Sequence, residues 1–412
     1  MSRSPRLGKK ERYIVGLDIG STKTCALVGE HDEETGAVKF VALGAAESRG
    51  WRKGQIVTLE LAVSSIRNAI EQAESIVGIP LDTALIGVAG GHVRGVNSRG
   101  GITLGQRPRD IQKDDVRRAV EAARNVTLPE DREVLHVLPQ EFFLDRQDNI
   151  RDAIGMVGQR LEANVHIVTA SAMAAQNIIT AVNRAGVVVS DTVLEPLAAA
   201  EACLTQDERD FGACLLDIGG GTTEMIVFGG GVVRHTGAVA IGGDHFTNDL
   251  AVGLRTPIPE AEKIKRDYAV VMPEMLAQDR PIEIASVGDR PPRTVFARML
   301  AEIVEARAQE LLTLVKDELR RAGLDTQIPA GLILTGGGAR LRGFPELTEK
   351  TFNLPVRVAS PRGISGMNEE MTQPEYATAV GLVLYGARTR RLANAKPAGW
   401  TGKLKALFAG AS

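Results

Sequence analysis

Two short segments of the chain carry the same pattern, an aspartate followed by a turn of small and hydroxylated residues. The first runs from Asp18 to Thr24 (DIGSTKT) and the second from Asp217 to Thr223 (DIGGGTT). Each turn lies between two apolar runs, a pattern typical of a β-hairpin with a carboxylate at the end of its first strand. One such turn is most often an ordinary hairpin, whereas two copies half a chain apart predict two loops that face each other across a cleft.

Both turns are candidate phosphate sites. Glycine lets the main chain approach an anion closely, and main-chain N–H groups, hydroxyls and an ammonium group are phosphate ligands. The candidate ligands are Gly20, Ser21, Thr22, Lys23, Gly219, Gly220, Gly221, Thr222 and Thr223. The carboxylates of Asp18 and Asp217 would repel phosphate, so we expect them to hold a hydrated Mg²⁺ ion through water. Two such turns would clamp a phosphate chain from both sides.

A third glycine cluster follows an apolar run near the end of the chain. It comprises Gly336, Gly337 and Gly338, with Arg340 two residues further on. A main chain without side chains can pack against a flat base or bind phosphate where a helix begins. On its own such a cluster is more often a loop than a nucleotide site. After the two aspartate turns we interpret it as a third element of that site.

The segments that would position these turns alternate between strands and helices. Hydrophobic periodicity predicts strands at 37–46, 84–88 and 133–145, the last interrupted by Pro139, and helices at 58–77, 110–124 and 296–322. The segments 171–185 and 191–204 each fit a helix or a strand followed by a helix. Alternation of this kind indicates an α/β fold with buried sheets.

Composition excludes several classes of protein. The 412 residues suffice for two or three domains, while 49 basic against 51 acidic residues and 4% aromatics argue against nucleic acid as a partner. Cys25, Cys203 and Cys214 lie in apolar runs without metal-binding spacing, so we expect buried thiols in a reducing compartment. The six histidines are scattered and predict no metal cluster. Neither a membrane-spanning run nor a signal peptide is evident, which predicts a protein that stays in the cytoplasm.

The ordered set of motifs resembles the actin/Hsp70/hexokinase ATPase superfold. The segments 18–24 and 217–223 resemble its phosphate loops, 335–345 its adenosine motif, and 193–200 and 376–382 its two connecting helices. In actin-like members the acid before the proline of the first connecting helix positions the attacking water. The resemblance therefore makes Glu195 the candidate for that role, although a carboxylate there could equally cap the helix. Glu262 and Lys265 resemble the pair that meets ribose and base, and as i and i+3 neighbours they could equally form a surface ion pair.

Further segments resemble the FtsA family of bacterial cell-division proteins. They are 85–92, 134–141, 165–169, 286–293 (SVGDRPPR) and 300–307, and the resemblance runs from about residue 12 to the C-terminus. It implies a duplicated actin-like (ribonuclease H-like) α/β fold, with two lobes around a nucleotide cleft and a relocated subdomain called 1C. The implied division is 1A at 1–83, 164–205 and 361–388, 1C at 84–163, 2A at 206–228 and 307–360, 2B at 229–306, and a basic linker and helix at 389–412.

The resemblance also implies a function. Such proteins bind ATP and Mg²⁺, form filaments, anchor FtsZ filaments to the cytoplasmic face of the bacterial inner membrane and recruit later division proteins. ATP would act as a polymerisation switch, with weak hydrolysis at most. The C-terminal peptide of FtsZ would dock on subdomain 2B, where the candidates, unless they are ordinary surface charges, are Arg290, Arg293, Glu302, Glu305 and Arg307. A pilus-assembly adaptor of the PilM type, a small-molecule kinase and an MreB-like filament stay open as alternatives.

The last residues supply a candidate membrane contact. Residues 388–412 hold six basic residues and no acidic ones. Trp400, Leu404, Leu407 and Phe408 fall on one stripe of a helix, with Lys403 and Lys405 flanking it. Bulky apolar residues bordered by lysines suit a helix in the headgroup region of an anionic membrane, although the stripe could instead dock on the protein's own surface. A single short helix binds weakly, and polymerisation would multiply its hold through avidity.

Overall fold

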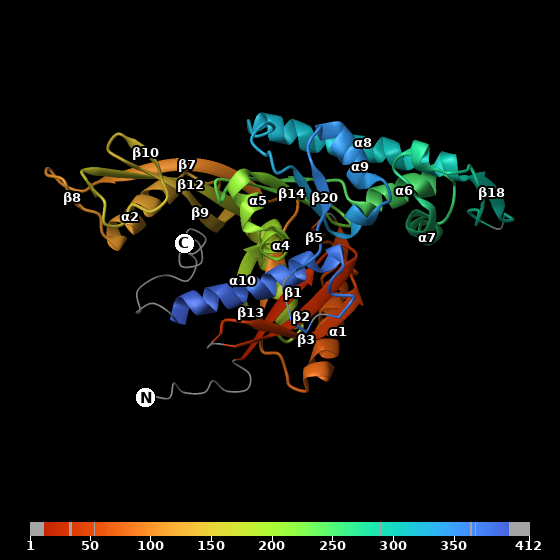
Figure 1. The fold of residues 1–412 in the computed structure, drawn as a ribbon. Coiled ribbons are helices and arrows are strands. Elements are labelled where there is room, and N and C mark those ends of the chain that lie inside the picture. The colour runs from red at the N-terminus through yellow and green to blue at the C-terminus, as the bar shows by residue number, and fades with distance from the viewer. Residues whose placement is uncertain are drawn as a thin grey trace.

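Two five-stranded sheets of the same design form the two lobes, and a third sheet is inserted beside them (Figure 1). The computed structural model describes residues 12–32, 35–52, 54–288, 290–362, 365–366 and 368–394. The predicted membrane stripe from Trp400 to Phe408 therefore lies outside the described residues. Within them, no helix has both the length and the apolar character needed to cross a membrane.

The sheet of the first lobe contains a meander and two parallel strands. Its order is β13 (Val188–Leu194), β6 (Thr83–Val88), β1 (Tyr13–Ile19), β2 (Lys23–His31) and β3 (Val38–Glu47). β1, β2 and β3 are antiparallel neighbours, whereas β6 runs parallel to β1 and β13 parallel to β6. Side chains of β1 alternate between two buried faces, with Ile14 in one core and Leu17 in the other. Because both faces are covered, the strand is buried along nearly its whole length.

The second lobe repeats this topology. Its sheet has the order β20 (Val356–Val358), β19 (Leu332–Thr335), β14 (Ala213–Ile218), β15 (Thr223–Gly229) and β16 (Val232–Val239). β14, β15 and β16 are antiparallel, and β19 and β20 extend the sheet in parallel from β14. The duplication predicted from the two aspartate turns is confirmed by this strand order. The turns are the β1–β2 and β14–β15 connections.

The two lobes share one apolar core. It includes α4 (Glu195–Cys203) and α10 (Ala377–Asn394), together with Ile14 of the first sheet and Ile226 of the second. The two helices cross so closely that a Cβ on Gly381 would lie 1.8 Å from the carbonyl oxygen of Ala198, so only glycine fits there. Two packed helices therefore join the lobes.

The remaining helices cover the outer faces of the sheets. α1 (Leu59–Val77) and α3 (Ala172–Arg184) pack on the first sheet. On the second sheet and around it lie α6 (Gly243–Gly253), α7 (Ile258–Tyr268), α8 (Ala297–Arg321) and α9 (Phe344–Phe352). Smaller elements are α5 (Gln206–Phe211), the hairpins β4 (Trp51–Arg52)–β5 (Gln55–Ile56) and β17 (Pro281–Ile284)–β18 (Arg293–Phe296), and the short 3₁₀ helices η2 (Pro273–Met275), η3 (Gly337–Arg340) and η4 (Pro374–Tyr376).

The inserted sheet lies at one end of the molecule (Figure 1). Its order is β10 (Gln147–Ile150), β9 (Arg132–Leu144), β12 (Arg160–Ser171) and β7 (Arg94–Thr103), with α2 (Lys113–Arg124) in its core and the pair β8 (Arg109–Asp110)–β11 (Val157–Gly158) beside it. Its strands β9 and β12 contribute residues to the core that the lobes share. Pro139 does not interrupt β9, because the pairing with β12 shifts by one residue there and leaves a bulge. The strands of this sheet span 94–171, whereas the expected inserted segment was 84–163, and β6 belongs to the first lobe's sheet.

The helix expected from Asp110 begins at Lys113 instead. Asp110 lies in β8, and the acid that caps the helix is Asp115. Its carboxylate accepts the Gln112 N–H at 3.0 Å and pairs with Arg109 at 2.6 Å, which holds the pKa of Asp115 below its ordinary value. The segment 191–204 is a strand followed by a helix, with the change at Leu194. Cys25, Cys203 and Cys214 are buried free thiols, as expected.

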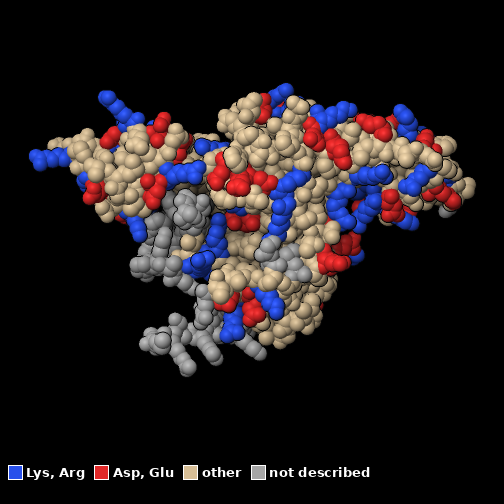
Figure 2. Space-filling view, in the orientation of Figure 1, with Lys and Arg blue, Asp and Glu red and all other residues tan. Residues whose placement is uncertain are grey.

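Charged side chains are mixed on the surface. Figure 2 shows basic and acidic residues interspersed across both lobes and the inserted sheet. The formal net charge of the whole chain is -2. On the face shown, no single sign dominates in the manner of a nucleic-acid groove.

Candidate functional site

A cleft of about 880 Å³ lies between the lobes, and both aspartate turns line it. The predicted residues that it brings together are Asp18, Gly20, Ser21, Thr22, Lys23, Glu195, Asp217, Gly219, Gly220, Gly221, Thr222, Glu262, Lys265, Gly336, Gly337, Gly338 and Arg340. The exception is Thr223, which lies in β15, is fully buried and donates its hydroxyl to the Ile241 carbonyl at 2.8 Å. The prediction that Thr223 binds phosphate does not fit this position.

The two turns have the same internal geometry. The Gly20 N–H donates to the Lys23 carbonyl at 2.9 Å, and the Gly219 N–H donates to the Thr222 carbonyl, also at 2.9 Å. The turns meet at their tips, where a Cβ on Gly220 would lie only 2.5 Å from Cγ2 of Thr22. Glycine at position 220 therefore allows the two loops to face each other at contact distance.

Four carboxyl groups are buried around this contact, those of Asp18, Glu195, Asp217 and Glu224. Burial raises the pKa of Asp18 to about 6, with Lys23 opposing the rise and Asp217 adding to it. Burial and the neighbouring carboxylates raise the pKa of Glu195 well above its ordinary value. Asp217 accepts a hydrogen bond from the Thr378 hydroxyl at 2.9 Å, which offsets part of its burial. Such a cluster of acids would be stabilised by a divalent cation.

Glu195 is the first residue of α4, and the N-cap position before it is Leu194. Its side chain lies over the first lobe's sheet, so that a Cβ on Gly87 would lie 2.7 Å from its Cγ. Glycine at position 87 makes room for the carboxyl group to reach the cleft. Glu195 therefore lies both in the first turn of α4 and in the lining of the cleft.

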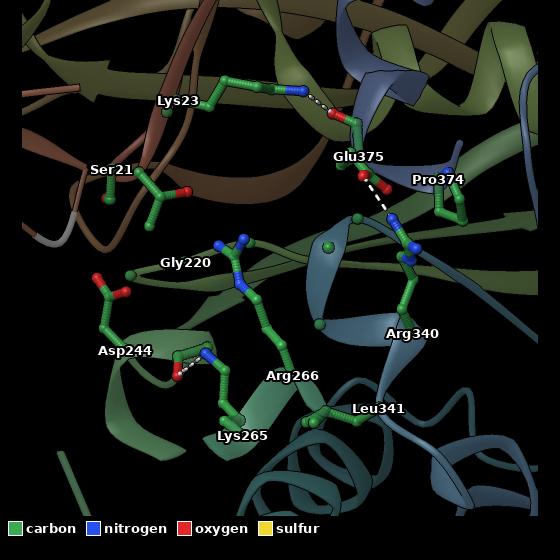
Figure 3. Close-up of a pocket in the computed structure, with 18 of the residues that line it drawn as sticks. Ser21, Lys23, Gly220, Asp244, Lys265, Arg266, Arg340, Leu341, Pro374 and Glu375 are labelled. Atoms are coloured by element: carbon green, nitrogen blue, oxygen red, sulfur yellow. Dashed lines mark hydrogen bonds and ion pairs between the residues drawn. The ribbon is translucent and has the colours of Figure 1, made fainter. Parts of the chain in front are cut away.

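Lys23 lines the cleft but its ammonium group is directed at η4. The Nζ atom donates to the Glu375 carbonyl at 2.9 Å and lies 3.2 Å from the centre of the Tyr376 ring. Arg340 reaches the same residue from the second lobe, with 2.7 Å between Nη1 and the Glu375 carboxylate. Figure 3 shows Lys23 and Arg340 both directed at Glu375. Glu375 thus ties the first turn to the third glycine cluster.

The third glycine cluster packs directly against the second turn. Gly336 has a φ of +79°, and a Cβ there would lie 2.4 Å from Oδ1 of Asp217. A Cβ on Gly338 would lie 2.3 Å from the Ile218 side chain. The Gly336 N–H also donates to the Pro374 carbonyl at 3.3 Å. Glycine at these positions lets η3 approach the strand that carries Asp217.

Glu262 and Lys265 form the ion pair that their spacing predicted, and they also line the cleft. The Lys265 Nζ lies 2.6 Å from the Glu262 carboxylate and donates to the Gly243 carbonyl at 3.0 Å. Burial opposes ionisation of Glu262, but hydrogen bonds from Lys265 and Thr247 hold its pKa below the ordinary value. In Figure 3 Lys265, Arg266 and Asp244 lie on the wall opposite Lys23.

Several cleft residues were missed by the sequence analysis, namely Glu224, Asp244, Glu375, Tyr376 and Thr378. One of them left a signal in the duplication. Glu224 follows the second aspartate by the same number of residues as Cys25 follows the first, so the two repeats differ there by a carboxyl group. Among the described residues, no group of three or more histidines, cysteines or acids is arranged to hold a metal by itself.

The residues expected to receive the FtsZ peptide lie on and next to α8, where four of the five already have partners within the chain. Arg307 holds the Asp249 carboxylate of α6 at 2.6 Å and 3.0 Å, and Arg293 donates to the Leu254 carbonyl. Glu302 pairs with Arg298 at 3.1 Å, and Glu305 accepts from Gln309 at 3.1 Å. Arg290 is exposed. Exposed apolar side chains in the same region are Val252, Val287, Phe296 and Met299.

Comparison with known proteins identifies the family. The family model described as cell division protein FtsA matches residues 214–381, and the one described as the SHS2 domain inserted in FtsA matches residues 90–169. The chain is 45% identical to cell division protein FtsA of Pseudomonas aeruginosa over 91% of its length and 89% of the relative. It is 36% identical to the FtsA proteins of Escherichia coli strain K12, over 91% and 90%, and of Bacillus subtilis, over 95% and 87%.

Solved structures share the fold at low sequence identity. A PilM–PilN type IV pilus biogenesis complex matches with a TM-score of 0.65 at 17% identity, over 91% of this chain and 98% of that one. MreB5 of Spiroplasma citri bound to ADP matches with a TM-score of 0.57 at 14% identity, over 94% and 100%. The duplicated sheets, the inserted domain and the close relatives agree, and the chain belongs to the FtsA family of actin-like cell division proteins.

Proposed function

We propose that the cleft binds ATP with Mg²⁺ and that the nucleotide controls assembly of the chain into actin-like filaments. These filaments would anchor FtsZ to the cytoplasmic face of the bacterial inner membrane and recruit later division proteins. The observation that carries the proposal is the contact between the two glycine turns at Thr22 and Gly220, inside a cleft that both lobes line. In a chain of this family, such a contact supports a phosphate clamp.

The residues of the cleft fit a nucleotide with a bound cation. The main-chain N–H groups and hydroxyls of Ser21 and Thr22, and the N–H groups of Gly220 and Gly221, would take the phosphates. Asp18 and Asp217 would hold Mg²⁺ through its water shell, since hydrated Mg²⁺ prefers carboxylate oxygens. The cation would supply the positive charge that the buried acids and the phosphates both need. Glu262, Lys265 and the glycines of η3 would take ribose and base.

Glu195 would orient a water molecule in the cleft. It lines the same cleft as Asp18 and Asp217, and the absence of a side chain at Gly87 leaves room for its carboxyl group. We expect slow hydrolysis at most, with the nucleotide acting as a switch. The two lobes share the α4–α10 core, so occupancy of the cleft would alter the angle between them and with it the surfaces that meet in a filament.

The FtsZ contact is proposed for the surface around the start of α8, in subdomain 2B. Exposed Phe296 and Met299 offer an apolar anchor, and Arg290, Glu302 and Glu305 offer charges around it. A peptide that mixes apolar and charged residues suits such a surface. Arg293 and Arg307 would act by holding the surface in shape, because their side chains bond Leu254 and Asp249.

The membrane contact is proposed for the amphipathic stripe from Trp400 to Phe408, with Lys403 and Lys405 facing anionic headgroups. In the proposed division, the inserted sheet is subdomain 1C and takes part in contacts between subunits. The likeness to the PilM–PilN structure is one of fold, and the chain belongs to the FtsA family, so we propose no second function.

Co-sedimentation with FtsZ and anionic lipid vesicles, with and without ATP, tests the proposal. We expect FtsZ to pellet with vesicles only when this protein is present, and more strongly with Mg-ATP. A variant without residues 397–412 should bind FtsZ but not vesicles, and Asp217→Asn should lose the effect of ATP. Pelleting of FtsZ that does not depend on this protein would overturn the anchoring role, and equal pelleting with and without ATP would overturn the switch.

A further inference from the structure

Lys23 is held at both ends, by its main chain and by its side chain. The Lys23 carbonyl accepts the Gly20 N–H at 2.9 Å and so closes the first turn. The ammonium group lies 3.2 Å from the centre of the Tyr376 ring and donates to the Glu375 carbonyl at 2.9 Å. A cation within about 6 Å of the face of an aromatic ring is attracted by the ring's quadrupole. The side chain therefore fixes the first turn to η4.

Tyr376 is well placed to hold this cation. It is the last residue of η4 and is only 5% exposed. Its hydroxyl donates to the carboxylate of Glu370, an exposed acid, so the hydroxyl has a partner of its own and the ring holds the ammonium group. Lys23 is half-buried, and the attraction between a cation and a ring is stronger where water is excluded. The contact is thus more than a chance pairing of surface side chains.

The second lobe fixes the position of η4. The Pro374 carbonyl, at the start of η4, accepts the Thr335 hydroxyl at 3.2 Å and the Gly336 N–H at 3.3 Å. Arg340 pairs with the Glu375 carboxylate at 2.7 Å. These donors belong to β19 and to the third glycine cluster. The first turn is therefore held by an element that the second lobe anchors, and its position follows that of the third glycine cluster.

We propose that Tyr376 is a positioning residue of the nucleotide site and acts through Lys23. Its ring face and the Glu375 carbonyl hold the ammonium group, so that the first turn presents the N–H groups of Ser21 and Thr22 to the phosphates in one arrangement. Donors that are already ordered bind an anion without the entropic cost of ordering the turn. Lys23 thereby shapes the turn and is not itself a phosphate ligand. This inference rests on the proposed binding of Mg-ATP.

The affinity of a fluorescent ATP analogue in Mg²⁺, measured for variants at both ends of the contact, tests the proposal. For Tyr376→Leu and for Lys23→Met we expect a fall of about tenfold, because the turn must then be ordered on binding. Tyr376→Phe keeps the ring face and should bind within about twofold of wild type. The double variant Lys23→Met, Tyr376→Leu should bind no more weakly than Lys23→Met alone, because both changes remove the same contact.

A second pair of a lysine and an aromatic ring supplies the matched control. The Lys316 ammonium lies 5.7 Å from the centre of the Phe352 ring, and neither residue lines the cleft. Phe352→Leu removes this ring as Tyr376→Leu removes the other, and it should leave the affinity for the ATP analogue unchanged.

Ring-fluorinated phenylalanines at position 376 give a second readout, which also serves if Tyr376→Leu does not fold. Fluorine weakens the quadrupole of the ring with little change of shape, so affinity should fall stepwise as fluorine atoms are added. A rise in affinity would show that Lys23 leaves the ring to bind phosphate, and it would overturn the inference. Equal affinity across the series, or losses that add up in the double variant, would overturn it too. A wild-type chain that binds no ATP analogue would instead overturn the proposed function itself.

Discussion

His166 of β12 and Thr236 of β16 share a hydrogen bond of 2.8 Å that joins the inserted sheet to the second lobe. The other ring nitrogen of His166 lies 2.7 Å from Oδ1 of Asn97, which also accepts from Gln140. The Nδ1 atom therefore carries a proton. Burial lowers the pKa of His166 to about 3 and keeps the ring neutral, so Nε2 accepts from the Thr236 hydroxyl. Gln140 adds a buried bond to the Val233 carbonyl at 2.8 Å. The inserted sheet, continuous with the first lobe, is thus fastened to the second.

Removing the Thr236 hydroxyl should weaken this junction. Thr236→Val keeps the shape of the side chain but leaves the buried Nε2 of His166 without a donor, which costs about 1–3 kcal/mol. Urea unfolding followed by circular dichroism measures the change. Thr313→Val, which removes a hydroxyl on the exposed side of α8, is the control and should change stability by less than about 0.5 kcal/mol. Equal stability of Thr236→Val and wild type would contradict a structural role for the bond.

The same histidine should make stability depend on pH. Burial lowers the pKa of His166 to about 3, with the neighbouring His235 contributing, whereas the unfolded chain protonates near 6.5. Below that value the unfolded state binds the extra proton, so stability falls as the pH falls. Between pH 7.5 and 5.5, proton uptake by His166 in the unfolded state should lower the free energy of unfolding by about 1.4 kcal/mol.

A His166 variant separates the effect of this histidine on the pH dependence of stability from the opposite effect of the buried acids. The buried acids Asp18 and Glu224 have raised pKa values, so they add stability as the pH falls. The difference between wild type and His166→Gln, followed by urea unfolding at several pH values, cancels them. The wild type should lose more stability than the variant between pH 7.5 and 5.5. Parallel curves would show that His166 is not held neutral.

Local pattern explains why the phosphate turns were predictable. Asp18 and Asp217, their glycines and the flanking strands follow from short-range sequence, because a hairpin with a glycine turn is a local structure. The helix 58–77 was equally local, with apolar residues at helical spacing and Gly78 ending it at a φ of +72°. The cleft residues that could be predicted are those that belong to a recognisable short motif, namely the two aspartate turns and the third glycine cluster.

Features that depend on the folded chain explain which cleft residues the sequence analysis misplaced or missed. Thr223 and Glu224 are neighbours in sequence, yet one hydroxyl turns to Ile241 and the other side chain faces the cleft, because successive strand residues alternate. The spacing alone placed Thr223 in the cleft, whereas the residue that faces the cleft is Glu224. The ammonium group of Lys23 is directed at Glu375, which lies 352 residues further along the chain. No local pattern encodes such a pairing.

Asp217 should be required for Mg-nucleotide binding. Asp217→Asn keeps the size and the bond with Thr378 but removes the charge expected to hold hydrated Mg²⁺. We expect affinity for a fluorescent ATP analogue in Mg²⁺ to fall at least tenfold, or about 1.4 kcal/mol. Asp317→Asn, on the exposed side of α8, should leave it unchanged. Retention of full affinity by Asp217→Asn would argue against the cleft as the cation site.

Phe296 should anchor the FtsZ peptide without contributing to folding. It is 54% exposed at the start of α8, so Phe296→Ala should leave the unfolding free energy unchanged while peptide affinity falls about tenfold. Phe211→Ala, at a side chain 71% exposed on α5, is the matched control and should affect neither. Arg307→Ala should behave differently and lower stability, because it frees the Asp249 carboxylate. Fluorescence anisotropy of a labelled FtsZ tail peptide and thermal unfolding separate the two effects.

The charge of the tail should decide which membranes the protein binds. Each lysine near an anionic surface contributes about 1 kcal/mol, so Lys403→Glu with Lys405→Glu should abolish sedimentation with anionic vesicles while leaving the apolar stripe intact. Trp400→Ala, which removes apolar area instead, should weaken binding to anionic and neutral vesicles alike. Nucleotide affinity should be unchanged in both, since the tail is remote in sequence from the turns. A filament presents many weakly binding tails to one vesicle, so the loss of vesicle binding in these variants should be smaller under conditions of polymerisation. If the charge-reversed variant bound anionic vesicles as well as the wild type does, these lysines would have no role in membrane binding.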